Sequence, residues 1–145
     1  ISDGASALIL ASHAAAQRHG VKPLAKMLGH ATHSRHPSEF TIAPVGAIDK
    51  LMKKLGWGVN DVDLFEINEA FAVVTLMAMD DLGLPHDKVN VFGGACAQGH
   101  PVGSTGSRII ATLIHALRAK GGKRGIASLC IGGGEATAVA VELMD

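Results

Sequence analysis

The apolar residues of this chain fall into short runs that alternate with segments of helical spacing. Short apolar runs bounded by turn residues are typical of buried strands, whereas apolar residues three and four positions apart indicate helices. The runs predict strands at 5–12, 23–34, 62–67, 89–92, 124–130 and 136–143. The helical spacing predicts helices at 12–20, 44–56, 68–83 and 104–121, with Ser12 and Pro44 at two of the starts and Gly20 and Gly56 at the corresponding ends.

This order of elements predicts an α/β fold. Strands that alternate with helices form a largely parallel sheet, and the last two strands are close enough in sequence to pair as an antiparallel hairpin, so we expect a mixed sheet of about five strands with helices on both faces. The segment Ile109–Leu117 is apolar nearly all round, and its helix is expected to be buried on several sides. Glu69 is expected in the first turn of its helix, where the helix dipole favours a negative charge.

Composition narrows the class of protein. The chain has 145 residues, a length that corresponds to one globular domain, and a formal net charge of zero argues against a nucleic-acid or anionic-membrane partner. No apolar run reaches the roughly 20 residues of a membrane-spanning helix. Cys96 and Cys130 do not have the pattern of a secreted disulfide framework and favour a reducing compartment. The chain begins at Ile1 without an initiator methionine, and we expect it to be a piece of a longer protein.

Three junctions between predicted elements carry reactive side chains. Asn68 follows a strand, His100 lies in the glycine-rich loop after a strand, and Cys130 ends a strand just before three glycines. In open α/β sheets, ligands bind in the crevice outside the carboxyl ends of the strands, where all three residues are predicted to lie. Glycine amides next to a cysteine can donate to an oxyanion, and a histidine exchanges protons near neutral pH.

Each of these residues taken alone also fits a structural role. Asn68 by itself is better explained as a helix N-cap, and His100 by itself is equally consistent with hydrogen bonding to backbone carbonyls. A cysteine in an apolar setting is more often a small buried hydrophobic residue, and this interpretation is kept for Cys96.

Two further patterns are rejected as binding sites. The histidines His30, His33 and His36 do not predict a metal site, because a spacing of three on an extended strand sends alternate side chains to opposite faces. The segment "GGKRG" lacks the spacing and the following Ser or Thr of a phosphate-binding loop. The sequence therefore predicts no metal ligands.

Three motifs in order are more specific than any single residue. "NEAFA" at 68–72, "GGACAQGHPVGSTGSR" at 93–108 and "CIGGGEATA" at 130–138 together resemble the C-terminal half of thiolases, over essentially the whole chain. The resemblance implies a thiolase-type C-terminal domain, half of an αβαβα sandwich whose middle layer contains the helix from Ser104. Residues 1–20 look like the terminal strand and helix of the thiolase N-terminal domain, and 21–145 like the C-terminal domain.

The resemblance also implies a reaction. Thiolases join two acetyl-CoA molecules by Claisen condensation to acetoacetyl-CoA and CoA, or reverse this by thiolysis. Cys130 matches the acid/base cysteine that acts on the α-carbon of acetyl-CoA. His100 matches the histidine that activates the acyl-carrying cysteine and, with a water held by Asn68, forms an oxyanion hole, while Gly132 matches an amide donor of a second oxyanion hole. These residues do not include the acyl-carrying cysteine, which the family places in its N-terminal domain.

Substrate and partners follow from the same resemblance. Ala70 and Phe71 match residues lining the pantetheine tunnel, and Phe40 lies where the family places a loop residue against that tunnel. We expect coenzyme A thioesters as substrates, with no covalently bound cofactor. Expected partners are acetyl-CoA, acetoacetyl-CoA, the thiolase N-terminal domain and further copies in a homodimer or homotetramer. A cytoplasmic location is expected, with mitochondrial or peroxisomal as alternatives.

Alternative functions remain within the same fold. A degradative 3-ketoacyl-CoA thiolase for longer chains shares all three motifs. A non-catalytic thiolase-like module that binds acyl-CoA is disfavoured, because a pure binder has no need of a base beside an oxyanion hole. Cys96, Gln98 and the pair Glu135-Ala136 depart from residues common in the family, which bears on substrate preference more than on the reaction.

Overall fold

The structure is a computed structural model that describes residues 1–144. Its helices and strands in chain order are α1 (His13–Arg18), β1 (Ala25–Ser34), α2 (Ala43–Leu55), β2 (Leu64–Ile67), α3 (Ala72–Leu82), α4 (Ala95–Gln98), α5 (Thr105–Lys120), β3 (Arg124–Cys130) and β4 (Glu135–Leu143). Short 3-10 helices occur at Pro37–Ile42, Val59–Asp61 and His86–Lys88.

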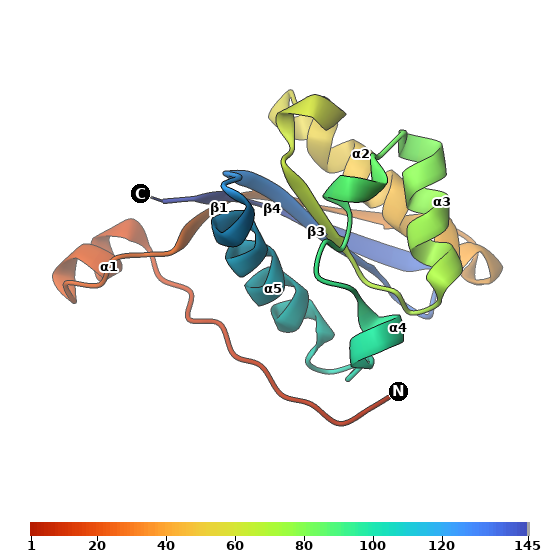
Figure 1. Cartoon of the computed structure of the whole chain (residues 1–145), viewed down its shortest axis with the longest axis horizontal. Helices are drawn as coiled ribbons and strands as arrows, with labels where there is room; N and C mark the ends of the chain where they lie inside the picture. Colours follow the sequence, from red (N-terminus) through yellow and green to blue (C-terminus); the bar gives the residue numbers. More distant parts are fainter. Residues whose placement is uncertain (145) are drawn as a thin grey trace.

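The strands form one mixed sheet in the order β1-β4-β3-β2 (Figure 1). The pairing of β2 with β3 is parallel, whereas β3 with β4 and β4 with β1 are antiparallel. The predicted mixed sheet and its terminal hairpin are therefore confirmed, but the prediction that the sheet is largely parallel is wrong. Besides the predicted hairpin, β1 pairs antiparallel with β4, so that in the described chain only one of the three strand pairs is parallel.

The predicted strand at 89–92 is reduced to one parallel bridge between Phe65 and Val89, which leaves four strands in the sheet. Asn90 adopts a φ of 47°, and its side chain takes over the pairing with β2. Its Oδ1 accepts from the Ile67 amide at 2.8 Å, and its Nδ2 donates to the Ile67 carbonyl at 2.9 Å. Because the side chain satisfies these groups, the backbone turns away into the glycine-rich loop.

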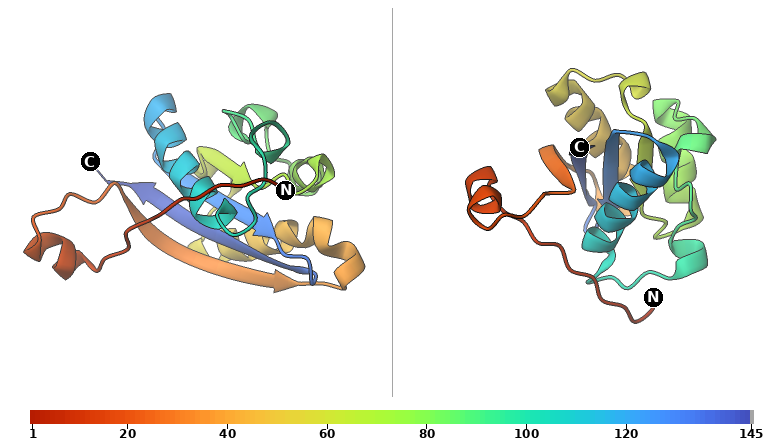
Figure 2. Two further views of the ribbon diagram at one scale, coloured as in Figure 1. Left: turned by 90° about the horizontal axis from the view of Figure 1, so that it is seen from below. Right: turned by 60° about the vertical axis from the view of Figure 1, so that its left-hand side comes forward.

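The predicted strand at 5–12 is absent from the described chain. Residues 1–11 are extended and run along the start of α5, where the Ser6 hydroxyl lies 2.6 Å from the hydroxyls of both Ser104 and Ser107 (Figures 1 and 2). This apolar run has no neighbouring strand to pair with and stays largely exposed. The helix predicted next is confirmed as α1, whose N-cap Ser12 accepts from the Ala15 amide at 3.2 Å.

Helices cover both faces of the sheet, as predicted. α2 and α3 pack on one face and α5 on the other (Figures 1 and 2). On the α2 face, Ala136, Ala138 and Ala140 of β4 are almost completely buried, and their small side chains allow the helix to lie close to the sheet. All four residues of β2 are buried, as expected for a strand covered on both faces.

The helix α5 is buried on one side only, so the prediction that it is buried on several sides is wrong for this chain. Ile109, Leu113 and Leu117 face the sheet and are buried, whereas Ile114 is half-buried and Arg118 is exposed. The described residues contain one sheet, so only one face of the helix has a partner.

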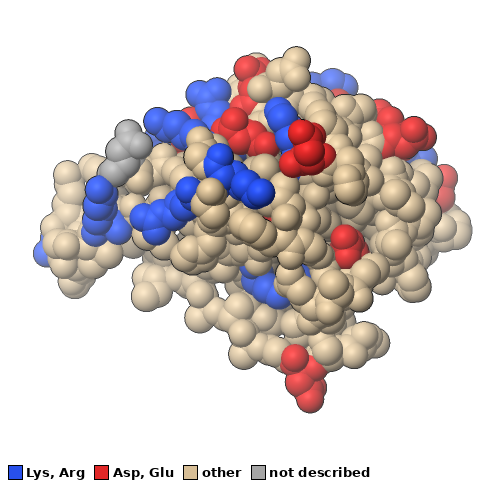
Figure 3. All heavy atoms as spheres, viewed as in Figure 1, with Lys and Arg blue, Asp and Glu red and all other residues tan. Residues whose placement is uncertain are grey.

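Charged side chains of both signs occur on the face seen in Figure 3. Lys and Arg gather toward its left end and Asp and Glu toward its upper and right parts, while the lower part around the N-terminal segment carries few charges. No helix among residues 1–144 is long and apolar enough to span a membrane.

The turn between β3 and β4 depends on Gly134. Its φ is 98°, its carbonyl accepts from the Arg35 amide at 2.9 Å, and a Cβ at this position would overlap the Arg35 carbonyl oxygen. Gly132 in the same turn has no such constraint, because nothing lies within 4 Å of a Cβ placed there.

We predict that Gly134→Ala lowers the free energy of unfolding by about 1–3 kcal/mol, because alanine is strained at this φ and meets backbone that cannot move freely. Gly132→Ala is the matched control and should stay within about 0.5 kcal/mol of the wild type. Denaturant titration of the full-length protein measures both. Equal stabilities of the two variants would contradict the assignment.

Candidate active site

The buried end of β2 carries Asn68, whose side chain joins two other parts of the chain. Asn68 is 2% exposed, and its backbone amide donates to the Ser128 carbonyl of β3 at 2.9 Å. Its Nδ2 lies 3.5 Å from Nε2 of His100, and its Oδ1 accepts from a terminal nitrogen of Arg108 at 3.3 Å. Because the N-cap of α3 is Phe71, the interpretation of Asn68 as the N-cap of this helix is wrong.

His100 is held at the end of the glycine-rich loop. Its Nδ1 lies 2.7 Å from the hydroxyl of Thr105, which begins α5. Partial burial of the ring, together with the positive charge of Arg108, lowers the pKa of His100 below its usual value. The imidazole is therefore neutral at neutral pH. The structure thus brings two of the predicted site residues, His100 and Asn68, into contact.

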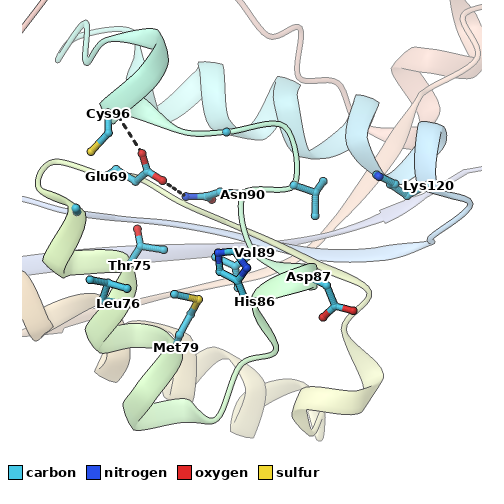
Figure 4. Close-up of a pocket in the computed structure, with 13 residues that line it drawn as sticks. Glu69, Thr75, Leu76, Met79, His86, Asp87, Val89, Asn90, Cys96 and Lys120 are labelled. Carbon is cyan, nitrogen blue, oxygen red and sulfur yellow. Dashed lines mark hydrogen bonds between the residues drawn. The ribbon is translucent and has the colours of Figure 1, made fainter.

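Glu69 anchors the glycine-rich loop rather than the start of a helix. The prediction that it lies in the first turn of α3 is wrong, because the helix begins at Ala72. Its carboxylate accepts from the Cys96 amide at 2.9 Å and from Nδ2 of Asn90 at 3.1 Å (Figure 4). A Cβ at Gly94 would overlap this carboxylate, which explains a glycine there. The loop that carries His100 is therefore attached to the residue next to Asn68.

An open pocket of about 520 Å³ lies beside this anchor, between α3 and the glycine-rich loop (Figure 4). Cys96 lines it and is exposed, so the interpretation of Cys96 as a buried hydrophobic residue is wrong. Neither His100 nor Cys130 lines this pocket, which is therefore distinct from the Asn68–His100 pair.

Cys130 ends β3 at the same edge of the sheet. It is half-buried, and burial raises the pKa of its thiol. Among the described residues, no hydrogen bond joins it to Asn68 or His100, but it lies two residues beyond Ser128, to which Asn68 bonds. Gly132 follows in an exposed turn with open space around it.

The three residues predicted to line a pantetheine tunnel lie on the α2 and α3 side. Phe40, in the 3-10 helix Pro37–Ile42, meets Phe71 edge to face with ring centroids 6.1 Å apart. Phe71 is 60% exposed, and the neighbouring Ala70 is half-buried against the core. Two aromatic rings from distant parts of the sequence thus form one partly exposed apolar surface.

The spaced histidines lie in different environments. The ring of His33 packs against Gly46 of α2, whereas His30 is exposed and Nδ1 of His36 accepts from the Ser38 amide at 3.3 Å. Within residues 1–144, no group of three or more His, Cys, Asp or Glu is arranged to hold a metal ion.

The sequence did not point to two charged residues close to Asn68, which are Glu66 in β2 and Arg108 in α5. Glu66 is 2% exposed in β2, and burial raises its pKa to about 7, while Arg108 opposes this shift and Glu69 adds to it. Glu66 Oε1 and Arg108 Nε are both buried without a hydrogen-bond partner in the described chain. The one sequence feature that could have indicated Glu66 is its position within the apolar run "LFEI", where a carboxylate is unusual.

Residues 21–143 match the family model described as the C-terminal domain of thiolase. The chain belongs to the thiolase family. This match spans most of the chain and includes all three motifs that carry the candidate site residues.

Named relatives of this thiolase domain include acetyl-CoA acetyltransferases. It is 48% identical over 145 residues to acetyl-CoA acetyltransferase IA of Candida tropicalis, covering 100% of this chain and 36% of the relative. It is 46% identical over 142 residues to the cytosolic acetyl-CoA acetyltransferase of Mus musculus, covering 98% of this chain and 36% of the relative. The chain therefore spans about a third of the length of these relatives.

Solved thiolase structures share the fold. Human mitochondrial 3-ketoacyl-CoA thiolase in complex with CoA matches with a TM-score of 0.90 and 45% identity, covering 93% of this chain and 34% of that chain. The α/β fold predicted from the order of elements, and the thiolase-type domain implied by the three motifs, are thereby confirmed.

The buried carboxyl of Glu66 predicts a pH-dependent stability of the thiolase domain. Its pKa in the folded protein, about 7, lies above the ordinary value of 4.5, so its stabilising contribution is present below pH 4.5 and is lost as pH rises through 7. Relative to Glu66→Gln, the wild type should lose about 2–3 kcal/mol between these limits. Denaturant titration of the full-length protein at pH 5, 6, 7 and 8 measures the difference.

Glu142→Gln is the control for this prediction. Its hydrogen bond to Arg124 lowers the pKa of Glu142, so that this carboxylate titrates below the measured range. The stability difference between wild type and Glu142→Gln should therefore be constant from pH 5 to 8. A constant difference for Glu66→Gln as well would show that Glu66 does not titrate in this window.

Proposed function

We propose that this chain supplies the C-terminal part of the active site of an acetyl-CoA C-acetyltransferase. The reaction is the reversible Claisen condensation of two acetyl-CoA molecules to acetoacetyl-CoA and CoA. The observation that carries the proposal is the hydrogen-bonded contact of the buried Asn68 with His100, at the sheet edge where Cys130 ends β3. The names of the fungal and mouse relatives support the same activity.

In the first step, the acetyl group of one acetyl-CoA moves to a cysteine that the thiolase N-terminal domain provides. His100 is neutral and accepts the proton of that thiol, so that the sulfur attacks as a thiolate. This role fits the lowered pKa of His100, because a ring that is already protonated cannot act as a base. The C–S bond to CoA breaks, and the departing CoA thiolate takes the proton of the Cys130 thiol, which leaves free CoA and a Cys130 thiolate.

In the second step, Cys130 acts as the acid/base. Its thiolate removes a proton from the α-carbon of the second acetyl-CoA, and the electron pair of that carbon attacks the acyl carbonyl. The bond to the acyl-carrying sulfur then breaks, and the sulfur leaves as a thiolate that recovers its proton from His100. Burial raises the pKa of Cys130, which makes its thiolate a stronger base and its thiol the proton donor in thiolysis.

Both steps place negative charge on thioester oxygens. His100 and a water held by Asn68 donate to the enolate oxygen, and the Gly132 amide donates to the oxygen of the acyl-enzyme intermediate. A hydrogen-bond donor that already points at the developing charge lowers the activation free energy by roughly 3–4 kcal/mol.

The aromatic surface of Phe40 and Phe71, with Ala70 beside it, borders the pantetheine of the CoA thioester in this proposal. Residues 1–20 belong to the N-terminal domain, whose sheet covers the outer face of α5. The protein works as a homodimer or homotetramer in this proposal. A cytosolic location is supported by the name of the mouse relative, a cytosolic acetyl-CoA acetyltransferase.

A degradative 3-ketoacyl-CoA thiolase is the second candidate. The likeness to the human mitochondrial enzyme of that name, at 45% identity, favours it as directly as the other relatives favour the first. Rates of thiolysis for 3-ketoacyl-CoA substrates of four to sixteen carbons separate the two, since the acetyltransferase should act on acetoacetyl-CoA alone. A module that only binds acyl-CoA would show no thiolysis with any of them.

The role of Cys130 predicts a selective loss. In the full-length protein, Cys130→Ala should slow condensation and exchange of the acetyl-CoA methyl protons by at least about 100-fold, because the general base is missing. Acetyl transfer to the N-terminal cysteine should stay measurable by mass spectrometry. The exposed Cys96→Ala is the control and should condense at the wild-type rate. Undiminished condensation by Cys130→Ala would refute its role.

The aromatic contact predicts a binding defect. Phe40→Ala should raise KM for CoA thioesters about 3- to 10-fold with little change in kcat, since an aromatic contact contributes about 0.5–1.5 kcal/mol to ground state and transition state alike. Phe92→Ala is the control, because its exposed ring lies under Lys120 and not against Phe71. An equal fall in kcat and kcat/KM would place Phe40 at the reacting atoms instead.

A further inference from the structure

Arg108 determines which way the amide of Asn68 points. A guanidinium group can only donate hydrogen bonds, so the Asn68 atom that it contacts at 3.3 Å must be the oxygen Oδ1. The other end of the amide, Nδ2, then faces His100. Both contacts are made by a side chain that is buried.

The orientation of Asn68 determines the tautomer of His100. Nδ2 can only donate, so Nε2 of His100 accepts across 3.5 Å and carries no hydrogen. The ring is neutral, so its one hydrogen lies on Nδ1, which donates to the Thr105 hydroxyl at 2.7 Å. That hydroxyl donates in turn to the Pro101 carbonyl at 3.0 Å. Every link from Arg108 to Pro101 thus has one donor and one acceptor.

We propose that Arg108 is a positioning residue that sets the direction of this chain of hydrogen bonds, so that His100 presents the lone pair of Nε2 to the site. The proposal rests on the function proposed above. It assigns Arg108 a role through Asn68 and His100, without contact to the substrate, and assigns Thr105 the role of the acceptor that completes the chain.

The direction of these hydrogen bonds suits both proposed roles of His100, as the base for the acyl-carrying thiol and as a donor to the thioester oxygen. With Nε2 unprotonated, the ring takes the proton of the acyl-carrying thiol: the S–H bond breaks, an Nε2–H bond forms, and the sulfur keeps the electron pair. The new Nε2–H can then donate to the thioester oxygen. The same transfer removes the acceptor of Asn68 Nδ2, which becomes free to donate to a water at the site.

The surroundings of Arg108 explain how a cation is tolerated behind the site. Glu66 of β2 lies in the same interior, and the positive charge of Arg108 favours the charged form of Glu66. The positive charge of Arg108 acts on Glu66 and on His100, and Glu69, which follows β2, acts on Glu66. Within residues 1–144, Arg108 Nε and Glu66 Oε1 are both buried without a hydrogen-bond partner, an arrangement that lowers stability.

The first test reads the tautomer directly in the full-length protein labelled with ¹⁵N-histidine, with the His100 signals identified by their loss in His100→Gln. We expect hydrogen on Nδ1 in the wild type and a mixture of tautomers in Arg108→Met. Hydrogen on Nε2 in the wild type, or an unchanged tautomer in Arg108→Met, would overturn the proposal. This measurement does not depend on turnover, so a wild type without acetyl transfer refutes the proposed function separately.

The second test is kinetic. Arg108→Met should slow acetyl transfer from acetyl-CoA roughly 100-fold with KM within about twofold, because a misplaced base loses the reactive geometry. In the pH–rate profile of acetyl transfer, the acidic limb should move to higher pH in Arg108→Met, because removing a positive charge raises the pKa of His100. The matched control is Arg118→Met on the exposed side of α5, which should keep the wild-type rate and pH profile.

Arg108→Lys keeps the charge and a donor, and it serves if Arg108→Met does not fold. It should recover part of the rate and leave the pH limb near the wild-type position, because lysine lacks the planar fork of arginine but carries the same charge. Wild-type rate and tautomer in Arg108→Met, or a loss in Arg108→Lys as large as that in a folded Arg108→Met, would contradict a role through charge and donation.

Discussion

The buried amide of Asn68 is the interaction on which the site depends. A buried amide without hydrogen-bond partners costs about 1–3 kcal/mol, so the end of β2 is stable only if other segments approach it. Those segments are α5, through Arg108, and the glycine-rich loop, through His100. The same hydrogen bonds that satisfy Asn68 therefore hold the imidazole at the edge of the sheet where β3 ends in Cys130.

At the edge of the sheet beyond β2, side chains likewise supply hydrogen-bond partners for buried polar groups. Asn90 uses its side chain to pair with Ile67, and Glu69 then bonds to Asn90 and to the Cys96 amide. The described sheet therefore has four strands, and a loop takes the place of the strand predicted at 89–92. Backbone pairing with β2 stops where the loop that carries His100 begins. The side chain of Asn90 satisfies the backbone groups of Ile67 that a further strand would otherwise pair with.

The thiolase family relation gives these contacts their chemical meaning. A neutral histidine, an amide and a cysteine of raised pKa at one sheet edge suit a reaction that moves protons and builds charge on thioester oxygens. The one-sided burial of α5 and the exposed apolar segment 1–11 fit the proposed thiolase N-terminal domain, whose sheet would cover both. Within the described residues, no second sheet covers these surfaces. The pocket beside Glu69 lies apart from the Asn68–His100 pair.

By itself, the sequence determined the alternation of elements, the hairpin of β3 and β4, the helix-covered sheet and the family, because apolar spacing and glycine motifs are local patterns. It also pointed to Asn68, His100 and Cys130 as candidates. Only the tertiary structure decided that β1 pairs with β4, that Asn90 ends the sheet and that Glu69 binds a loop instead of capping a helix. It alone placed Arg108 behind Asn68. These features depend on which buried polar groups meet in space, and residues 40 positions apart in sequence carry no local signal of their contact.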